Sequence, residues 1–305
     1  MNTFITLLRR EWLQHRLGWL ILLSVPTVLT LGLVLLGNSA HIQLNGDDIS
    51  LADARRAAPA LQTLLITLIV MVITFALTVL AVGFQLPGLA RRDVQDRSIE
   101  FWLSLPVGHA QSVGATLTAH SLLLPVAALL AGLVGGQLVA AAAAIVMQGP
   151  VAWLTQPWPA MLLGLAALLT RLVLGVALAL TWLSPLILLT MAASAWLKRW
   201  GLPVVMGLLF AGVPLLDHYL GQDVFKTALT RLMDESRQAL ITTSPLPDHL
   251  TLSADVLAIL MGMPAWALRD LGNALSHLAS AFWLLATALG AGGFGLLVLR
   301  RQRGA

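Results

Sequence analysis

The chain contains no cysteine and few charged residues. Charged side chains make up 10% of its 305 residues, whereas soluble domains carry about 25%. Without cysteine there are no disulfides and no thiolate metal sites. The hydrophobic share of 58% and the mean hydropathy of +0.86 are typical of an integral membrane protein.

The signatures of several enzyme classes are also missing. The only lysines, Lys198 and Lys226, do not follow the glycine pattern of a GxxxxGK[ST] phosphate loop, and no HExxH or GxSxG motif occurs. We therefore expect that the chain is not itself an enzyme, binds no cofactor and leaves any ATP to another chain. Four histidines scattered over the polar regions predict solvated side chains rather than a metal site: His41, His218, His249 and His277.

Long apolar stretches predict an all-α membrane protein of one domain, residues 1–305, because about 20 apolar residues suffice to cross a bilayer. The third stretch is longer than needed, which predicts a tilt, a break near Pro125 or an extension beyond the bilayer. Its small residues, Gly132, Gly135, Gly136 and the alanines at 140–144, favour a close helix contact over a dimer seam. The six predicted spans are residues 17–37, 60–84, 114–147, 160–196 or 172–196, 201–216 and 273–299.

Two further helical regions are expected. In residues 1–16, Phe4, Leu8 and Trp12 recur at a spacing of four beside arginines, which predicts an interfacial helix; the alternative is a ragged start to the first span. Residues 217–272 predict a helical extracytoplasmic insertion between spans five and six. It would contain an amphipathic helix at 224–240, a second helix from about Ser253, and a third that begins near Pro264 and leads into the last span.

Basic residues predict the topology. Both termini and residues 91–97 and 198–199 carry most of the arginine and lysine, whereas residues 38–59 and 217–272 are acidic overall. The positive-inside rule then places both termini in the cytoplasm. The pI of about 10.6 is explained by these boundary residues, and no nucleic-acid partner is expected.

The most highly charged run lies between the second and third apolar stretches. It covers residues 91–107, RRDVQDRSIEFWLSLPV, within a loop at 87–112. Each charge would cost roughly 2.5–3.5 kcal/mol at the centre of a membrane helix, so the run is expected outside the bilayer. Its charged start and its apolar, aromatic end predict a short amphipathic helix between a soluble partner and the membrane bundle.

This run resembles the cytosolic loop of type-2 ATP-binding-cassette (ABC) exporter permeases. The resemblance rests on Asp96-Arg97-Ser98-Ile99, Phe101-Trp102 and Ser104-Leu105-Pro106-Val107, and on the opening Leu8-Arg9-Arg10-Glu11-Trp12. In that family the loop carries a coupling helix that sits in a cleft of the ATPase. The resemblance thus implies an ATPase-coupling set: Arg91, Arg92, Asp93, Asp96, Arg97, Ser98, Ile99, Glu100, Phe101, Trp102, Leu105 and Pro106.

The same resemblance implies partners and a location. Two copies of the chain would pair with two copies of a separate ATPase that binds ATP and Mg²⁺, in the plasma (inner) membrane of a bacterium. The cargo, whether peptide antibiotic, lipid or small molecule, stays open. An alternative is a non-transporting membrane anchor or sensor with a ligand-binding outer insertion; an intramembrane enzyme acting on lipids is less favoured, because the spans contain few acids and histidines.

Arg171 is the candidate residue of a substrate pathway. If the fourth span begins at Ala160, Arg171 lies near mid-membrane, where it would pair with an acid or meet an anionic headgroup. If the span begins at Leu172, residues 160–170 form a shallow or re-entrant segment and Arg171 reaches water at the boundary. The first case predicts that Arg171→Ala abolishes transport and leaves assembly intact.

Overall fold

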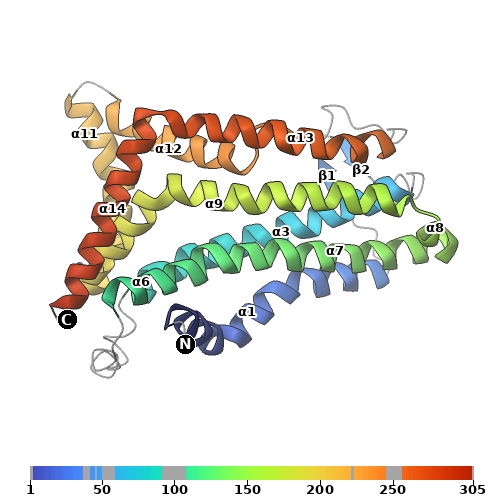
Figure 1. Cartoon of the computed structure of the whole chain (residues 1–305), viewed down its shortest axis with the longest axis horizontal. Coiled ribbons are helices and arrows are strands. Elements are labelled where there is room, and N and C mark those ends of the chain that lie inside the picture. The colour runs from blue at the N-terminus through green and yellow to red at the C-terminus, as the bar shows by residue number, and fades with distance from the viewer. Residues whose placement is uncertain are drawn as a thin grey trace.

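The computed structural model describes residues 3–36, 42–44, 47–49, 59–90, 108–220, 223–244 and 256–303. This part of the chain is almost wholly helical (Figure 1). The exception is a hairpin of β1 (Ile42–Leu44) and β2 (Asp47–Ile49), in which Ile42 lies opposite Ile49. Five stretches are long and apolar enough to cross a membrane: Thr3–Leu35, Pro59–Leu89, His109–Gln148, Trp158–Tyr219 and Ala281–Gln302. The fold is that of a multi-pass membrane protein.

Helix α1 (Thr3–Leu35) combines the expected interfacial helix and the first apolar stretch in one bent helix (Figure 1). The residues that α1 buries fully differ from Phe4, Leu8 and Trp12, whose spacing predicted a face for the membrane interface. Leu7, Glu11 and Trp19 are buried, whereas Trp12 is 42% exposed. The exposed apolar residues are suited to lipid, so apolar spacing alone does not identify the face that packs on the protein.

The third apolar stretch is continuous but changes its winding beside Pro125. It consists of α6 (His109–Leu117), the π-helix η1 (Thr118–Leu123) and α7 (Leu124–Gln148). Proline has no N–H to donate and crowds the carbonyl one turn earlier, which favours a local change of the hydrogen-bond pattern. The break expected near Pro125 therefore takes the form of a π-turn.

The small-residue face of α7 packs within the chain, against α3 (Pro59–Leu89). A Cβ on Gly132 would lie 2.6 Å from the Cα of Met71, and a Cβ on Gly136 would lie 2.7 Å from the Cα of Thr67. Such an approach is open only to glycine. Gln137 adds a hydrogen bond to Thr67 of 2.8 Å. These residues make the intrachain helix contact that the sequence favoured.

After α8 (Pro150–Leu154), α9 (Trp158–Leu197) runs for 40 residues, about 60 Å at 1.5 Å per residue. Because α9 is continuous from Trp158, the alternative in which residues 160–170 form a separate segment is wrong. The helix ends at Lys198, which has a φ of 54°. The chain continues through η2 (Lys198–Trp200), α10 (Gly201–Gly207), the π-helix η3 (Leu208–Gly212) and α11 (Val213–Leu220).

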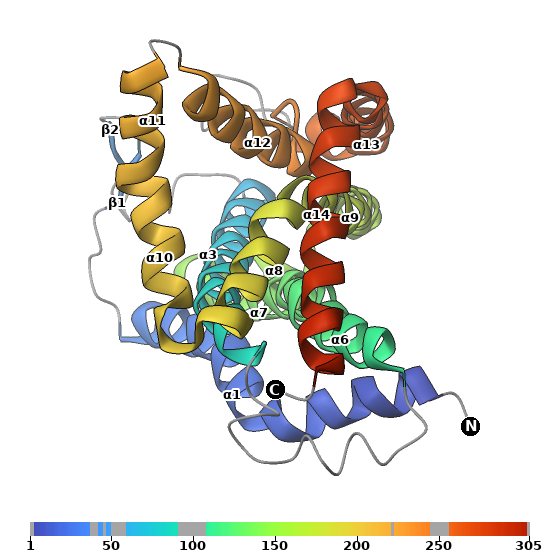
Figure 2. The same ribbon diagram turned by 90° about the vertical axis from the view of Figure 1, so that its left-hand side faces the viewer.

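The segment from α10 to α11 turns back against the end of α9 (Figure 2). A Cβ on Gly201 would lie 2.2 Å from the Cα of Ser194, so the backbones are almost in contact. The long stretch Trp158–Tyr219 is thus a helical hairpin with its bend at residues 198–200, where the sequence had placed the boundary between the fourth and fifth spans.

The C-terminal third contains α12 (Val224–Leu240), α13 (Val256–Ser276), η4 (His277–Ala279) and α14 (Ala281–Gln302). The helix expected at 224–240 is confirmed. The expected helix start at Pro264 is wrong, because α13 passes through Pro264 while Leu260 and Met263 are buried against α9. The last apolar helix begins at Ala281 instead of 273, where the side chain of Ser280 accepts a hydrogen bond from the backbone N–H of Trp283.

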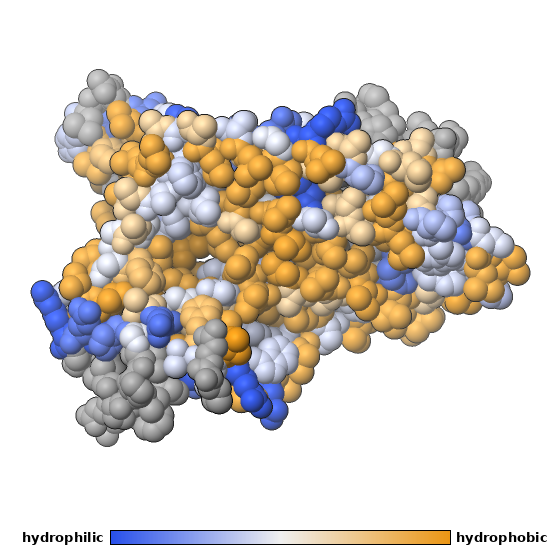
Figure 3. Space-filling model, in the orientation of Figure 1, coloured by the Kyte–Doolittle hydropathy of each residue, from blue (hydrophilic) through white to orange (hydrophobic). Residues whose placement is uncertain are grey.

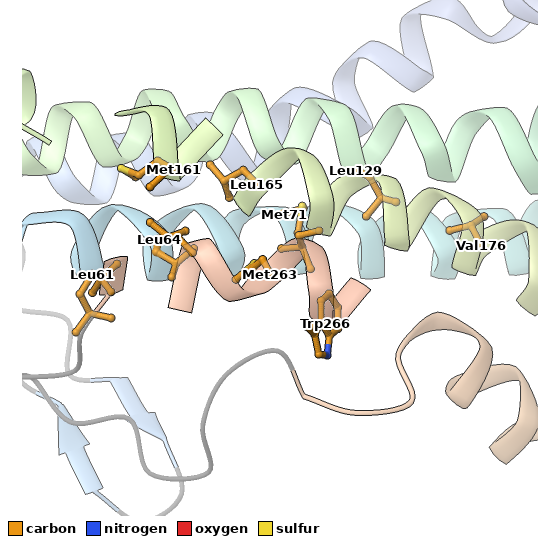
Figure 4. Packing of buried hydrophobic residues seen from close by; sticks show 13 residues of the cluster. Leu61, Leu64, Met71, Leu129, Met161, Leu165, Val176, Met263 and Trp266 are labelled. Carbon is orange, nitrogen blue, oxygen red and sulfur yellow. The ribbon is translucent and has the colours of Figure 1, made fainter. Parts of the chain in front are cut away.

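The buried residues form two main groups. One lies along the starts of α3 and α9 and against α13, and includes Leu64, Met161 and Trp266 (Figure 4). The other, which we call the terminal cluster, joins α1 to the ends of α3, α9 and α14 and to α6–η1; its buried members are Trp19, Val82, Leu86, Ala119, Leu124, Met191, Ala192 and Leu297. Outside these groups, apolar residues cover most of the face shown in Figure 3, as expected for a surface in lipid.

Candidate functional site

The predicted ATPase-coupling residues, Arg91 to Pro106, lie outside the described residues. Their flanks are described. The chain leaves α3 at Leu89 and enters α6 at His109. Leu89, Ala90 and Val113 all pack against the terminal cluster. The segment that resembles a coupling loop therefore begins and ends at the same packed end of the bundle, beside α1 and the last turns of α9 and α14.

Cations and tryptophans gather at this end. The guanidinium groups of Arg300 and Arg303 each lie 5.6 Å from the ring centroid of Trp196, and that of Arg199 lies 5.8 Å from the ring of Trp200. Tryptophan and arginine are both enriched at membrane boundaries, where the ring meets headgroups and the cation reaches water. The arrangement is typical of the boundary between a membrane and a basic aqueous face.

A carboxylate and two imidazoles meet between α1 and η1, at the edge of the terminal cluster. Helix α1 presents Glu11 and, one turn later, His15, and the π-helix presents His120 from the other side. Glu11 and His120 are both 0% exposed. Glu11 Oε2 lies 3.4 Å from His120 Nε2. We call Glu11, His15 and His120 the Glu–His cluster.

Two side chains beside the Glu–His cluster donate hydrogen bonds to one oxygen of the Glu11 carboxylate. Arg10 Nη2 donates to Glu11 Oε1 over 2.5 Å, and the hydroxyl of Thr116 donates to the same oxygen over 3.0 Å. Trp19 closes the other side, with its ring centroid 6.0 Å from that of His15 and 5.1 Å from that of His120. The cluster thus ties α1 to α6–η1 through side chains.

Three buried polar atoms near this junction have no hydrogen-bond partner among the described residues. They are His120 Nδ1, Trp19 Nε1 and Ser121 Oγ. Buried polar atoms are nearly always paired, so such a concentration in one place needs an explanation. His120 and Ser121 both lie in the π-helix η1, a type of turn that occurs often at functional sites.

Arg171, the candidate residue of the substrate pathway, is 1% exposed and pairs with Asp270 of α13. Its Nε donates to Asp270 Oδ2 over 2.8 Å, and its Nη1 donates to the carbonyl of Ala239 over 3.0 Å. Its Nη2 lies 2.7 Å from Oδ2 without a well-aligned hydrogen bond. The pairing with an acid is one of the outcomes that the sequence suggested for a buried Arg171.

Asp270 also organises the chain that follows α12. Its carboxylate accepts hydrogen bonds from the backbone N–H groups of Thr242 and Thr243, at 3.2 and 2.7 Å, and from the hydroxyl of Thr243 at 2.9 Å. The indole N–H of Trp266 donates to the carbonyl of Thr243 over 3.1 Å. We call Arg171, Asp270 and these threonines the Arg–Asp network. It joins α9, the end of α12 and α13 into one unit.

Asp217 caps the N-terminal end of α12. Its two carboxylate oxygens accept from the backbone N–H groups of Phe225 and Lys226 at 3.0 and 2.9 Å. A carboxylate at a helix N-terminus satisfies free N–H groups and complements the helix dipole. Further along α12, Glu235 lies 2.7 Å from His277. In the region predicted as an outer insertion, α12 is therefore held at its start by Asp217 and just after its end by Asp270.

Comparison with protein families, with curated proteins and with solved structures finds no match for this chain. Its function must therefore be argued from its own residues and geometry.

Proposed function

We propose that the chain is the membrane permease subunit of an ATP-driven exporter of the type-2 ABC class. It would work as a homodimer with two copies of a separate ATPase, which holds ATP and Mg²⁺. Residues 91–107 would transmit closure of the ATPase dimer to the helices. The complex would lie in a bacterial plasma membrane with both termini of the chain in the cytoplasm.

The observation that carries the proposal is the composition of the terminal cluster. Leu8 and Trp19 of α1 pack in the same cluster as Leu297, near the end of α14. We infer from this shared cluster that both ends of the chain lie on one side of the membrane, so that the chain would cross it an even number of times. The hairpin at residues 198–200 would supply the sixth pass, since the 20 residues of Gly201–Leu220 have a helical length of about 30 Å, the thickness of the hydrocarbon core.

In the proposed topology, residues 91–107 would lie on the same side of the membrane as both termini, with most of the basic residues. A coupling element must be rigidly connected to the helices that it moves. The flanks of residues 91–107 meet this need, because Leu89 and Val113 pack on the same cluster as Met191 of α9 and Leu297 of α14. Force applied to the loop would reach α1, α3, α9 and α14 through one packed group.

On the far side, the Arg–Asp network fastens α12 and α13 to α9, and we propose that this region is a lid or docking surface outside the cytoplasm. A role for Arg171 in the substrate pathway then requires a second conformation. In the structure its guanidinium is enclosed by α9, α12 and α13. The cargo stays open among peptides, lipids and small molecules.

The test uses the double variant Arg97→Glu/Phe101→Ala in a tagged chain, purified from its native membranes with its bound partners. We expect the wild type to retain an ATPase subunit and ATP hydrolysis, and the double variant to lose both. The matched control makes the same two changes on exposed residues of α12, Arg237→Glu/Phe225→Ala, and should retain both. An ATPase that co-purifies and turns over equally with the two variants would exclude this coupling site.

Wild-type chain that retains no ATPase at all would instead support the rival function of a membrane anchor or sensor. The two functions differ in this one result, because a permease of this class cannot work without a nucleotide-binding partner.

A further inference from the structure

The Glu–His cluster has the composition of a metal site. Glu11 and His15 lie four residues apart on α1 and so project from one face of the helix. His120 faces them from η1. One ligand atom from each of the three residues can be chosen so that all lie within 4.8 Å of one another, the only such group found among the described residues. Two imidazoles and one carboxylate are ligands that Zn²⁺ and related ions take in proteins.

The distance between Glu11 and His120 is that of two ligands of one ion. Their closest atoms are 3.4 Å apart, longer than the usual 2.7–3.2 Å of an N–H···O hydrogen bond. Ligands bound at about 2.0–2.2 Å in a tetrahedron lie roughly 3.3–3.5 Å apart. The spacing of the two atoms thus fits a long hydrogen bond and also fits two ligands of one ion.

The relative positions of the two histidine rings are also compatible with ligands of one ion. The centroids of His15 and His120 are 4.9 Å apart, with the ring planes at 80°. Two imidazoles on one tetrahedral ion hold their centroids roughly 5 Å apart, given bonds of about 2.0–2.1 Å to nitrogen. The ligand atoms lie within 4.8 Å of one another, so binding one ion requires them to approach more closely, and rotation of the half-buried His15 side chain can bring its nitrogen nearer.

The surroundings favour one arrangement of the ligands. Arg10 and Thr116 both bind Oε1 of Glu11, so Oε2 is the oxygen that faces His120. Partners of this kind orient a ligating carboxylate. Neither tautomer of His120 is fixed from its far side, since Nδ1 has no partner among the described residues. His120 Nε2 can thus present a lone pair toward Oε2.

A cavity with a mainly apolar lining lies beside the cluster. A cavity of about 450 Å³ lies between α1 and α3, and its lining includes His15, Trp19, Gln14 and Gln85. A metal site needs both a ligand set and a path for the ion. Of the three cluster residues, His15 alone lines this cavity.

From these observations we propose that Glu11, His15 and His120 bind a divalent transition-metal ion, with Zn²⁺ as the representative, and that the bound ion fastens α1 to the π-helix η1. The proposed site includes none of residues 91–107, and it stands or falls independently of the proposed export function.

The test is calorimetric titration of the purified chain with Zn²⁺, using a tag without histidine. We expect one ion per chain, and at least about 10-fold weaker binding for His15→Gln and for His120→Gln. The control is His218→Gln, which removes an exposed histidine on α11 and should bind like the wild type. Titration with Co²⁺ gives a second readout, because visible absorption bands of a histidine-bound ion should appear with the wild type and not with His15→Gln.

Absence of Zn²⁺ binding by the wild-type chain would overturn the proposal. So would equal affinity of the His15→Gln and His218→Gln variants, which would show that any bound ion sits elsewhere. His120→Gln changes a fully buried residue and must first be checked for wild-type helicity and a monodisperse elution profile. If it fails this check, the half-buried His15 decides the matter alone.

Discussion

The Arg–Asp network and the Glu–His cluster each contain a buried carboxylate, but the two carboxylates have different kinds of hydrogen-bond partner. Asp270 accepts four hydrogen bonds, two of them from the backbone N–H groups of Thr242 and Thr243. Glu11 contacts the side chains of Arg10, Thr116 and His120. The first carboxylate is therefore held partly by main chain, whereas these contacts of the second come from side chains, which can rotate.

The difference suggests different uses. A network anchored to backbone cannot rearrange without unfolding the segment that it holds, so the Arg–Asp network should contribute mainly to stability. The Glu–His cluster lies at a π-turn, beside buried polar atoms with no partner among the described residues. It is the better candidate for a site that binds a ligand or changes conformation.

The largest effect is expected at Arg171. Arg171→Met leaves Asp270 as a buried, unpaired charge and should lower the free energy of unfolding by about 3–5 kcal/mol. The double variant Arg171→Met/Asp270→Asn should recover much of this loss, since the amide oxygen still accepts from Thr242 and Thr243. Unfolding in detergent measures both, with the exposed neighbour Arg269→Met as the control.

This expectation departs from the sequence-based one, in which Arg171→Ala abolishes transport and leaves assembly intact. The structure makes Arg171 part of what holds α12 and α13 on α9. A variant at 171 with wild-type stability and no transport would restore the pathway interpretation and break the contrast between the two sites.

An intermediate effect is expected at Thr243. Thr243→Val removes a hydroxyl that donates to a buried carboxylate, a bond to a charged group worth about 1.5–3 kcal/mol. The adjacent Thr242→Val removes only a hydroxyl bonded to the carbonyl of Gln238, a neutral bond worth about 0.5–1.5 kcal/mol. The ratio of the two losses, measured by the same unfolding assay, reports how strongly Asp270 organises this segment. Equal losses would mean that it does not.

The smallest effect on stability is expected at Glu11. Arg10 is 11% exposed, so after Glu11→Gln its guanidinium can turn toward water or headgroups, a route closed to Arg171. We expect a loss of about 1 kcal/mol in the presence of a chelator, less than for Arg171→Met. If Glu11→Gln and Arg171→Met lower the free energy of unfolding equally, the two sites do not differ in the way described above.

The sequence predicted features that depend on local pattern. The bounds of α12 follow from amphipathic spacing, and the reversal near Lys198 follows from a charged break between apolar runs. A break near Pro125 was one of three alternatives for the third stretch, and the structure has a π-turn in a continuous helix there. The passage of α13 through Pro264 was not predicted, because tertiary packing of Leu260 and Met263 on α9 outweighs the local preference for a break.

The two buried sites could be predicted only in part. Arg171 stood out as a charge in an apolar run, but its partner Asp270 is 99 positions away and was one of several acids in a polar region. Glu11 and His120 are 109 positions apart, and no spacing rule connects them. One local signal existed, since Glu11 falls on the same stripe of α1 as the buried Leu7 and Trp19.

The measurement that tests the central claim most directly is the sidedness of residues 91–107. Because the chain has no cysteine, a single Ser98→Cys or Thr155→Cys can be labelled with a maleimide that does not cross membranes. We predict that Cys at 98 reacts in inside-out vesicles and is protected when the ATPase is bound, and that Cys at 155 reacts only in right-side-out vesicles. Labelling of position 98 from the outside, or from the inside with no protection by an active ATPase, would contradict the account.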